Sequence, residues 1–233
     1  DPESSGSCSF VTRTPAPVRE RRPGVYDTRV PISTEEGEAV LNQVIETIRN
    51  RRSIRKYLPE QISREKLDAI LDAAIWAPSG HNDQPWRFLV IQDAATLDAI
   101  NEETKKNMKE SSIEWVRDMG NNEKFHVFYH APTVIVVSGA QDADGVLKPI
   151  VDCSAAIQNM LLAATSLGVG SCWVGLTAFF FANREKVRAL GIPEGCVPYY
   201  SVTLGYPDPT LTPRAPKRKE NCVSWCAAPD TKR

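Results

Sequence analysis

The 233-residue chain lacks any apolar run that approaches the ~18 residues of a membrane-spanning helix. Its first residues also lack the apolar core of a signal peptide. Charges of the two signs almost cancel, because 28 Lys and Arg stand against 29 Asp and Glu and give a net charge of -1. An excess of positive charge would favour nucleic acid as a partner. We therefore expect neither a membrane nor nucleic acid to be a partner of this chain.

The chain also lacks the paired cysteines of a small secreted fold. Cys153 and Cys172 lie in apolar stretches, where a thiol behaves as a small hydrophobe. Cys222 and Cys226 form a C-x3-C pair, and metal or redox chemistry there would require further ligands. We expect a reducing, cytoplasmic environment. Because the chain begins with Asp1 and not with Met, we also expect a truncated start that has lost any targeting residues.

Several catalytic motifs are missing. No G-x-G-x-x-G follows a predicted strand, no P-loop occurs, and residues 168–170 (Gly-Val-Gly) follow a predicted helix, so a Rossmann domain is not indicated. No Ser/His/Asp or Cys/His arrangement for nucleophilic catalysis can be built from motif spacing. His126 and His130 share the spacing of zinc ligands but have no adjacent Glu and no third ligand. We expect them to lead into a strand, and we expect no metal site.

The most informative stretch is residues 51–86. Its centre, residues 62–77, has the apolar spacing of a helix that is buried on one face, with Ser63 as a good N-cap. Before this helix stand Arg51, Arg52, Ser53 and Arg55, a set of guanidiniums and one hydroxyl that suits a dianionic phosphate better than a single carboxylate. The dipole at the C-terminus of a preceding helix would also favour Arg51 and Arg52, but it does not explain Ser53 or Arg55.

After the helix comes a turn, residues 78–86, that is rich in amide groups. Asn82 and Gln84 can donate and accept hydrogen bonds, Ser79 adds a hydroxyl, and Gly80 allows a flat ligand to approach the backbone. We expect His81 to face solvent rather than to act in catalysis. A phosphate-binding cluster followed by an amide-rich turn is what flavin mononucleotide (FMN) would need.

The remaining periodicities predict an α+β fold with a central sheet. Five prolines and no periodicity mark residues 1–32 as an extended arm or leader, and the Pro-rich residues 207–233 as a second arm, so the domain occupies residues 33–206. Helices are predicted over 34–49, 62–77, 93–109, 113–119, 149–167 and 183–191, and strands over 86–92, 133–140 and 197–205. Asp93 and Asn183 are expected to cap the helices that begin at these residues.

In its Arg-Arg-Ser-x-Arg cluster and its Pro-Ser-x-x-Asn-x-Gln-Pro-Trp turn, the chain resembles the nitroreductase family of flavoenzymes over residues 45–219. The resemblance implies a mainly antiparallel sheet flanked by helices, with extended N- and C-terminal arms. It also implies a homodimer that holds FMN at the subunit interface, with the cluster from one subunit and the turn often from the other.

The resemblance further implies which residues bind the cofactor. For Trp173, packing in the core is as good an explanation as a contact between its side chain and the flavin. Residues 101–125, which would cover the flavin and shape the substrate pocket, identify no substrate. The phosphate would be held by Arg51, Arg52, Ser53, Arg55 and Arg218, with Lys217 as second choice for the last. The ring or ribityl chain would meet Pro78, Ser79, Gly80, Asn82 and Gln84, and the backbone of Trp173, Val174 and Gly175.

The implied activity is hydride transfer from NADH or NADPH through the flavin to a nitroaromatic, a quinone or a similar acceptor, with ping-pong kinetics. The chemistry would then belong to the flavin, which agrees with the absence of a catalytic triad. Relatives that carry out reductive dehalogenation or flavin fragmentation are an alternative, although the Glu, Tyr and Lys of a deiodinase lid are not evident in residues 101–125. A flavin-binding module without turnover is a second alternative.

Overall fold

The computed structural model describes residues 42–141, 148–219, 222, 224 and 226. Two compact units are distinguished, one comprising residues 41–215 and the other residues 1–40 and 216–233. In the second unit, the described residues 216–219, 222, 224 and 226 form no helix or strand. The expected boundaries at residues 32 and 206 stay a prediction.

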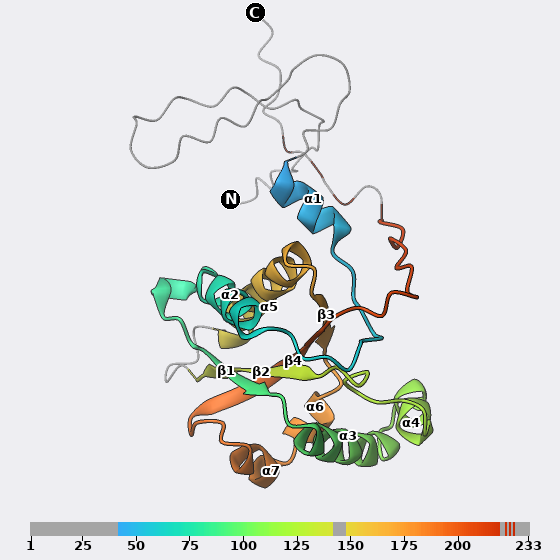
Figure 1. The fold of residues 1–233 in the computed structure, drawn as a ribbon. Helices are drawn as coiled ribbons and strands as arrows, with labels where there is room; N and C mark the ends of the chain where they lie inside the picture. Colours follow the sequence, from blue (N-terminus) through green and yellow to red (C-terminus); the bar gives the residue numbers. More distant parts are fainter. Residues whose placement is uncertain (1–41, 142–147, 220–221, 223, 225, 227–233) are drawn as a thin grey trace, which may run out of the picture. The chain divides into compact units, whose positions relative to one another are not determined.

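A four-stranded sheet forms the centre of the larger unit, and every neighbouring pair of strands is antiparallel (Figure 1). The spatial order is β1-β2-β4-β3, so β1 and β3 are the edges. Because helices cover both faces of the sheet, the sequence of β2 is a largely apolar run rather than an alternation of apolar and polar residues. The strands are β1 (Trp86–Ile91), β2 (Thr133–Ala140), β3 (Gly170–Val174) and β4 (Cys196–Gly205).

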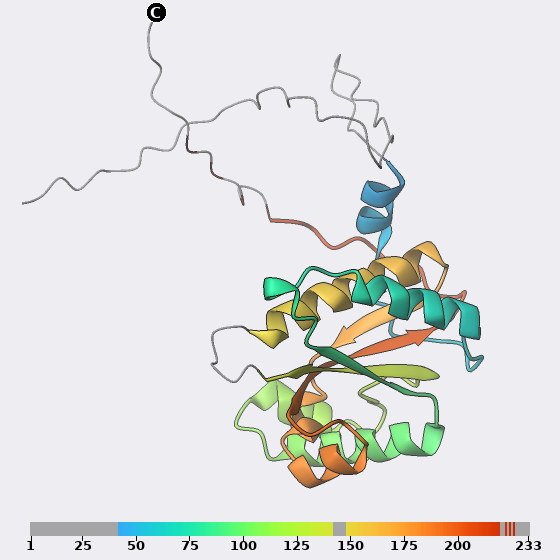
Figure 2. The same cartoon turned by 90° about the vertical axis from the view of Figure 1, so that its left-hand side faces the viewer.

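Helices form a layer on each face of the sheet (Figures 1 and 2). On one face α2 and α5 pack on each other and on the strands; on the other lie α3, α6 and α7, with α4 against α3. The helices are α1 (Gln43–Asn50), α2 (Arg64–Ile75), α3 (Ala94–Lys109), α4 (Glu114–Asn121), α5 (Pro149–Ser166), α6 (Ala178–Phe181) and α7 (Arg184–Ala189), and η1 (Gly80–Asn82) is a short 3-10 turn.

Each face has its own hydrophobic core. Beneath α2 and α5, the buried residues include Ile70, Ile157 and Met160, whereas on the other face Ile100 and Phe128 are buried. Alternate residues of one strand serve the two cores, because successive side chains of a strand point to opposite faces. In β3, Cys172 and Val174 therefore lie in the second core, and Trp173 packs against the first.

The α+β class and the mainly antiparallel sheet are confirmed. Three predicted N-caps are also confirmed, because Ser63, Asp93 and Asn183 each accept a hydrogen bond from the backbone of the first helical turn. The first helix was expected from residue 34; α1 begins at Gln43 with Asn42 as its N-cap, and residues 34–41 lie outside the described part of the chain.

Among the described residues, no helix combines the length and the apolar character that crossing a membrane would require.

Candidate functional site

The basic cluster is attached to an edge of the sheet. At Arg51 the backbone leaves the helical conformation and ends α1. Ser53 then forms an isolated parallel bridge with Ser171 of β3, and the N–H of Ile54 donates to the Ser171 carbonyl oxygen at 2.9 Å. Gly170 permits this approach, because a Cβ there would lie only 3.0 Å from Cγ2 of Ile54. The cluster is therefore fixed to β3 by backbone bonds and by a close packing contact.

Three members of the cluster gather around one buried thiol, Cys172. Burial raises the pKa of this thiol, and the neighbouring Arg55, Ser53 and Arg51 oppose the rise. The structure thus brings together the predicted residues Arg51, Ser53 and Arg55 on the part of β3 that carries Cys172. From the sequence alone Cys172 is a small apolar residue, because its interaction with Arg51 and Arg55 depends on the pairing of Ser53 with β3.

Unlike Arg51 and Arg55, Arg52 makes its side-chain hydrogen bonds to the backbone at the end of α1. Its Nη1 donates to the carbonyl oxygens of Arg49 at 2.6 Å and of Arg51 at 2.8 Å, so it satisfies acceptors at the end of α1. Its Nε is buried and has no hydrogen-bond partner. This agrees with the helix-terminus explanation of Arg52, and a contact between Arg52 and a phosphate stays a prediction.

A short ladder holds the cluster against the segment that follows β4. Tyr57 bridges Pro207, and the salt bridge between Lys56 Nζ and Asp208 Oδ2 measures 3.0 Å. Hydrogen bonds from Thr210, together with Lys56, lower the pKa of Asp208 to about 2. The residues directly after β4 therefore lie beside the cluster. Lys217 and Arg218, however, belong to the other unit, and their contact with a cofactor stays a prediction.

Three residues of the amide-rich turn have a left-handed backbone conformation. His81, Asn82 and Gln84 have φ of 50°, 60° and 49°, and Ser79 Oγ accepts the N–H of Gln84 at 3.0 Å. Nε2 of Gln84 donates to Oδ1 of Asn82 at 3.2 Å. The side chains of His81, Asn82 and Gln84 are exposed, as is that of Pro78. The turn therefore presents amide groups to its surroundings from a strained backbone, which is a common feature of ligand sites.

Within one chain the cluster and the turn lie far apart. The N–H of Gly80 donates to Asp152 in the first turn of α5 at 3.4 Å, whereas Ser53 bridges Ser171, beyond the last turn of α5. A helix of 18 residues is about 27 Å long. Figures 1 and 2 show η1 and residues 51–55 at opposite ends of the α2 and α5 layer. One chain therefore does not bring these two predicted groups of site residues together.

The third predicted segment is the end of β3 together with Gly175, which follows the strand. Trp173 is half-buried and packs edge-to-face on Tyr200 with the ring centroids 5.0 Å apart, which agrees with its core-packing explanation. Val174 is buried, whereas Gly175 is exposed, and a Cβ added there would meet nothing within 4 Å. The backbone at Gly175 is thus open to a ligand, as the predicted contact requires.

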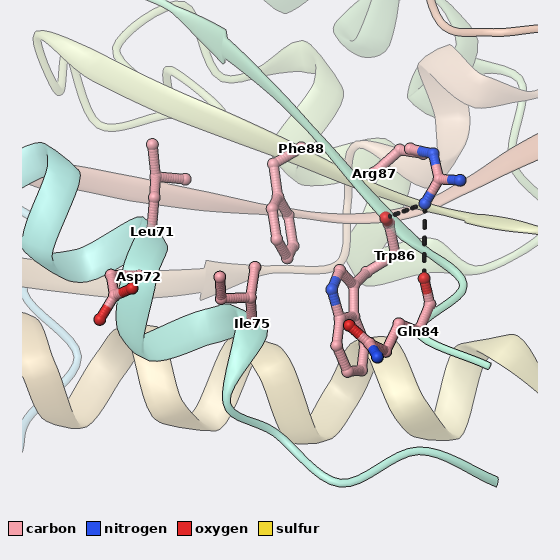
Figure 3. A pocket seen from close by; sticks show the side chains of 7 residues that line it. All are labelled: Leu71, Asp72, Ile75, Gln84, Trp86, Arg87 and Phe88. Atoms are coloured by element: carbon pink, nitrogen blue, oxygen red, sulfur yellow. Dashed lines mark hydrogen bonds between the residues drawn. The ribbon is translucent and has the colours of Figure 1, made fainter. Parts of the chain in front are cut away.

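Gln84 also lies at the mouth of a cavity of about 530 Å³ between α2 and β1 (Figure 3). Its wall is mainly apolar, and Nη1 of Arg87 donates to the Trp86 carbonyl oxygen at 2.7 Å and to that of Gln84 at 3.4 Å. These bonds place a charged side chain over carbonyl oxygens next to the free edge of β1, which discourages strand addition there. The cavity is lined by Leu71, Asp72, Ile75, Gln84, Trp86, Arg87 and Phe88.

The two spaced histidines lie in the segment before β2. The rings of His126 and His130 are tilted by 36° with centroids 4.2 Å apart, and Nε2 of His126 is 3.3 Å from Asp98. Within the described ranges, no group of three or more His, Cys, Asp or Glu residues could hold a metal ion. The structure therefore gives His126 a packing role.

Comparison with known proteins places this geometry in a family. The model of the nitroreductase family matches residues 48–206. A relative from Methanothermobacter thermautotrophicus, provisionally named an NADH dehydrogenase/NAD(P)H nitroreductase, is 35% identical over 177 residues, 74% of this chain and 81% of the relative. The FMN reductase [NAD(P)H] of Bacillus subtilis is 26% identical over 192 residues, 78% of this chain and 73% of that protein.

A solved structure agrees with the sequence comparisons. The nitroreductase with bound FMN from Bacteroides fragilis superposes with a TM-score of 0.71 and 36% identity, covering 78% of this chain and 98% of that one. The expected motifs, the antiparallel sheet and the matched residues lead to one conclusion. The chain belongs to the nitroreductase family.

Proposed function

We propose that this protein is an FMN-dependent oxidoreductase that uses NADH or NADPH to reduce a nitroaromatic, a quinone or a similar acceptor. The observation that carries the proposal is the gathering of Arg51, Ser53 and Arg55 on β3. These donors suit a phosphate, and the B. fragilis relative with the same fold holds FMN. The names of the M. thermautotrophicus and B. subtilis relatives support the nicotinamide reductant.

The residues present fit the cofactor in chemical type. Two exposed or half-buried guanidiniums and a hydroxyl would hold the phosphate, with Arg52, Lys217 and Arg218 as further candidates. The exposed amides of Asn82 and Gln84 can pair with the polar edge of a flavin ring. Pro78, Ser79 and Gly80 would flank that ring from the same turn, and the backbone of Trp173, Val174 and Gly175 from β3.

We also propose a homodimer, because one chain leaves the cluster and the turn at opposite ends of α5. A second copy can bring the turn of one chain to the cluster of the other. Large apolar side chains on α1 and at the end of α2 are available for such an interface: Val44 is 63% exposed and Trp76 is 78% exposed. A cavity of about 470 Å³ lies between α1, α2 and α5.

When bound, FMN accepts a hydride from a reduced nicotinamide and passes the electrons on to the acceptor. The chain's contribution is to bind and orient the cofactor and to leave one face of the ring open. Reductant and acceptor would then use that face in turn, which predicts ping-pong kinetics. We place the protein in the cytoplasm, where the buried thiols of Cys153 and Cys172 would stay reduced.

The deciding experiment begins with the absorbance spectrum of the purified full chain. We expect a yellow protein whose flavin bands bleach on addition of NADH or NADPH and return when a nitroaromatic or a quinone is added. Parallel lines in double-reciprocal plots of the initial rate, taken at several acceptor concentrations, would support the ping-pong mechanism.

A flavin that no nicotinamide bleaches would instead favour a binding module. Loss of halide from a halogenated substrate, without nitroaromatic or quinone reduction, would favour a dehalogenase. A chain that neither carries nor takes up FMN would refute the proposal.

A further inference from the structure

Two consecutive residues before β2 adopt a backbone conformation that is rare outside glycine. Tyr129 has φ of 55° and His130 has φ of 54°. Non-glycine residues stay in this region only when the surrounding structure imposes it, and they cluster at functional sites. The pair is therefore a reason to ask what this segment positions.

The segment is fixed from two sides. The backbone N–H of Phe128 donates to Nδ1 of His126 at 3.1 Å, and Oδ1 of Asn101, on α3, accepts the N–H of Val127 at 2.8 Å. The His126 ring also contacts Asp98 of α3 and packs on His130. These contacts hold the backbone on the N-terminal side of Tyr129 in one conformation. The direction in which the Tyr129 side chain leaves the backbone is therefore set by the fold.

That direction leads to the basic cluster. The guanidinium carbon of Arg55 lies 5.7 Å from the centroid of the Tyr129 ring, within the range of a cation–π contact. Phe125 packs edge-to-face on the same ring, with centroids 6.1 Å apart and an interplanar angle of 75°. Arg55 also interacts with Cys172 of β3. Arg55 is otherwise exposed, so the aromatic face restricts a long side chain that solvent would leave mobile.

We propose that Tyr129 is a positioning residue for the anion-binding cluster, holding the Arg55 guanidinium in the orientation in which it contacts bound FMN. This inference rests on the proposed function and extends it to a residue outside both sequence motifs. Two groups of Tyr129 act on the guanidinium: the ring makes the cation–π contact, and the hydroxyl interacts with the Arg55 side chain as a hydrogen-bond partner.

The test is a double-mutant cycle on FMN affinity, measured by quenching of flavin fluorescence on titration of the apoprotein of the full chain. We expect Tyr129→Leu to weaken FMN binding about 5-fold, as loss of a cation–π contact predicts. In an Arg55→Met background, the same change should alter the dissociation constant by less than about 2-fold, because the group that Tyr129 orients is already gone. Tyr129→Phe keeps the ring and removes only the hydroxyl, so we expect a smaller loss of affinity than in Tyr129→Leu.

Phe181→Leu is the matched control, because Phe181 packs edge-to-face on Phe180 at 6.3 Å and 78°, a similar aromatic pair in the same core. We expect it to leave FMN affinity within about 2-fold. Equal losses from Tyr129→Leu in both backgrounds, or no loss in the unmodified background, would each overturn the inference. If the unmodified chain does not bind FMN at all, the proposed function fails as well, so the two failures are distinguishable.

Discussion

Tyr57 donates its phenolic hydrogen to the carbonyl oxygen of Ile54 at 2.6 Å, and the same hydroxyl shares a hydrogen bond with Thr203 Oγ1 at 2.8 Å. Burial raises the pKa of Tyr57 far above its ordinary value, so the phenol remains a donor. One side chain thus joins the middle of the basic cluster to the central strand β4. The cluster keeps its shape through this bond as well as through its backbone contacts with β3.

Replacing Tyr57 by Phe removes that link without changing the packing volume. We expect Tyr57→Phe to lower the free energy of unfolding by about 1–2 kcal/mol, because the buried Ile54 carbonyl loses a partner. Urea denaturation of the apoprotein measures the loss. The matched control is Tyr199→Phe, whose hydroxyl accepts an exposed hydrogen bond from Gln141 at 2.8 Å and should cost less than half as much. Equal costs for the two variants would contradict the proposed link.

Arg51 and Arg55, which both interact with Cys172, should dominate flavin retention. We expect Arg51→Ala and Arg55→Ala each to weaken FMN binding by about 1.5–3 kcal/mol, because each removes a charge-assisted contact. The ratio of flavin to protein after gel filtration, followed by titration, measures this. Arg64→Ala is the control, since within the described part of the chain Arg64 pairs with Asp68 on the exposed face of α2. Unchanged flavin content in both cluster variants would refute the phosphate site.

Gly170 is predicted to be essential for the contact between the cluster and β3. In Gly170→Ala the new Cβ would lie 3.0 Å from Cγ2 of Ile54, tighter than ordinary packing allows. We expect a loss of about 1–3 kcal/mol in the free energy of unfolding, as for other overpacked cores. Gly175→Ala, where a Cβ meets nothing within 4 Å, should change stability by less than about 0.5 kcal/mol. Thermal unfolding of the two apoproteins separates these outcomes; equal stability would show that Ile54 shifts freely.

His126 should make stability depend on pH. Burial, and then the neighbouring His130, lower its pKa below the ordinary 6.5, against the opposing effect of Asp98, while Lys105 adds to the lowering. The unfolded chain therefore binds the proton first as pH falls, so this group's contribution is complete above about pH 6.5 and is lost between 6.5 and the lowered pKa. Protonation of Nδ1 would also break its bond with the Phe128 N–H.

Urea denaturation at pH 7.5 and 5.5 measures this effect, with His126→Gln as the comparison. We expect the unmodified chain to lose more stability between the two pH values than the variant does, because the variant cannot take up the proton. His81→Gln, an exposed change in the amide-rich turn, should keep the pH dependence of the unmodified chain. An identical slope for His126→Gln and the unmodified chain would contradict the assignment.

Local features were predictable because their causes are local. The run over residues 133–140 coincides with β2, and Ser63, Asp93 and Asn183 cap the helices that they were expected to cap. Each rests on periodicity or on a hydrogen bond within four residues. The helix-terminus role of Arg52 was foreseen as an alternative for the same reason. By contrast, Tyr129 carried no motif, and its relation to Arg55 spans 74 residues of sequence.

The sequence by itself determined which groups are candidates for binding a cofactor: a basic cluster and an amide-rich turn, with one helix between them. Only the tertiary structure decided how they are placed, because Ser53 meets Ser171 through strand pairing while Gly80 meets Asp152 at the other end of α5. Such placement depends on contacts between residues more than 70 positions apart, which the two cores and the strand order fix together and which no local pattern encodes.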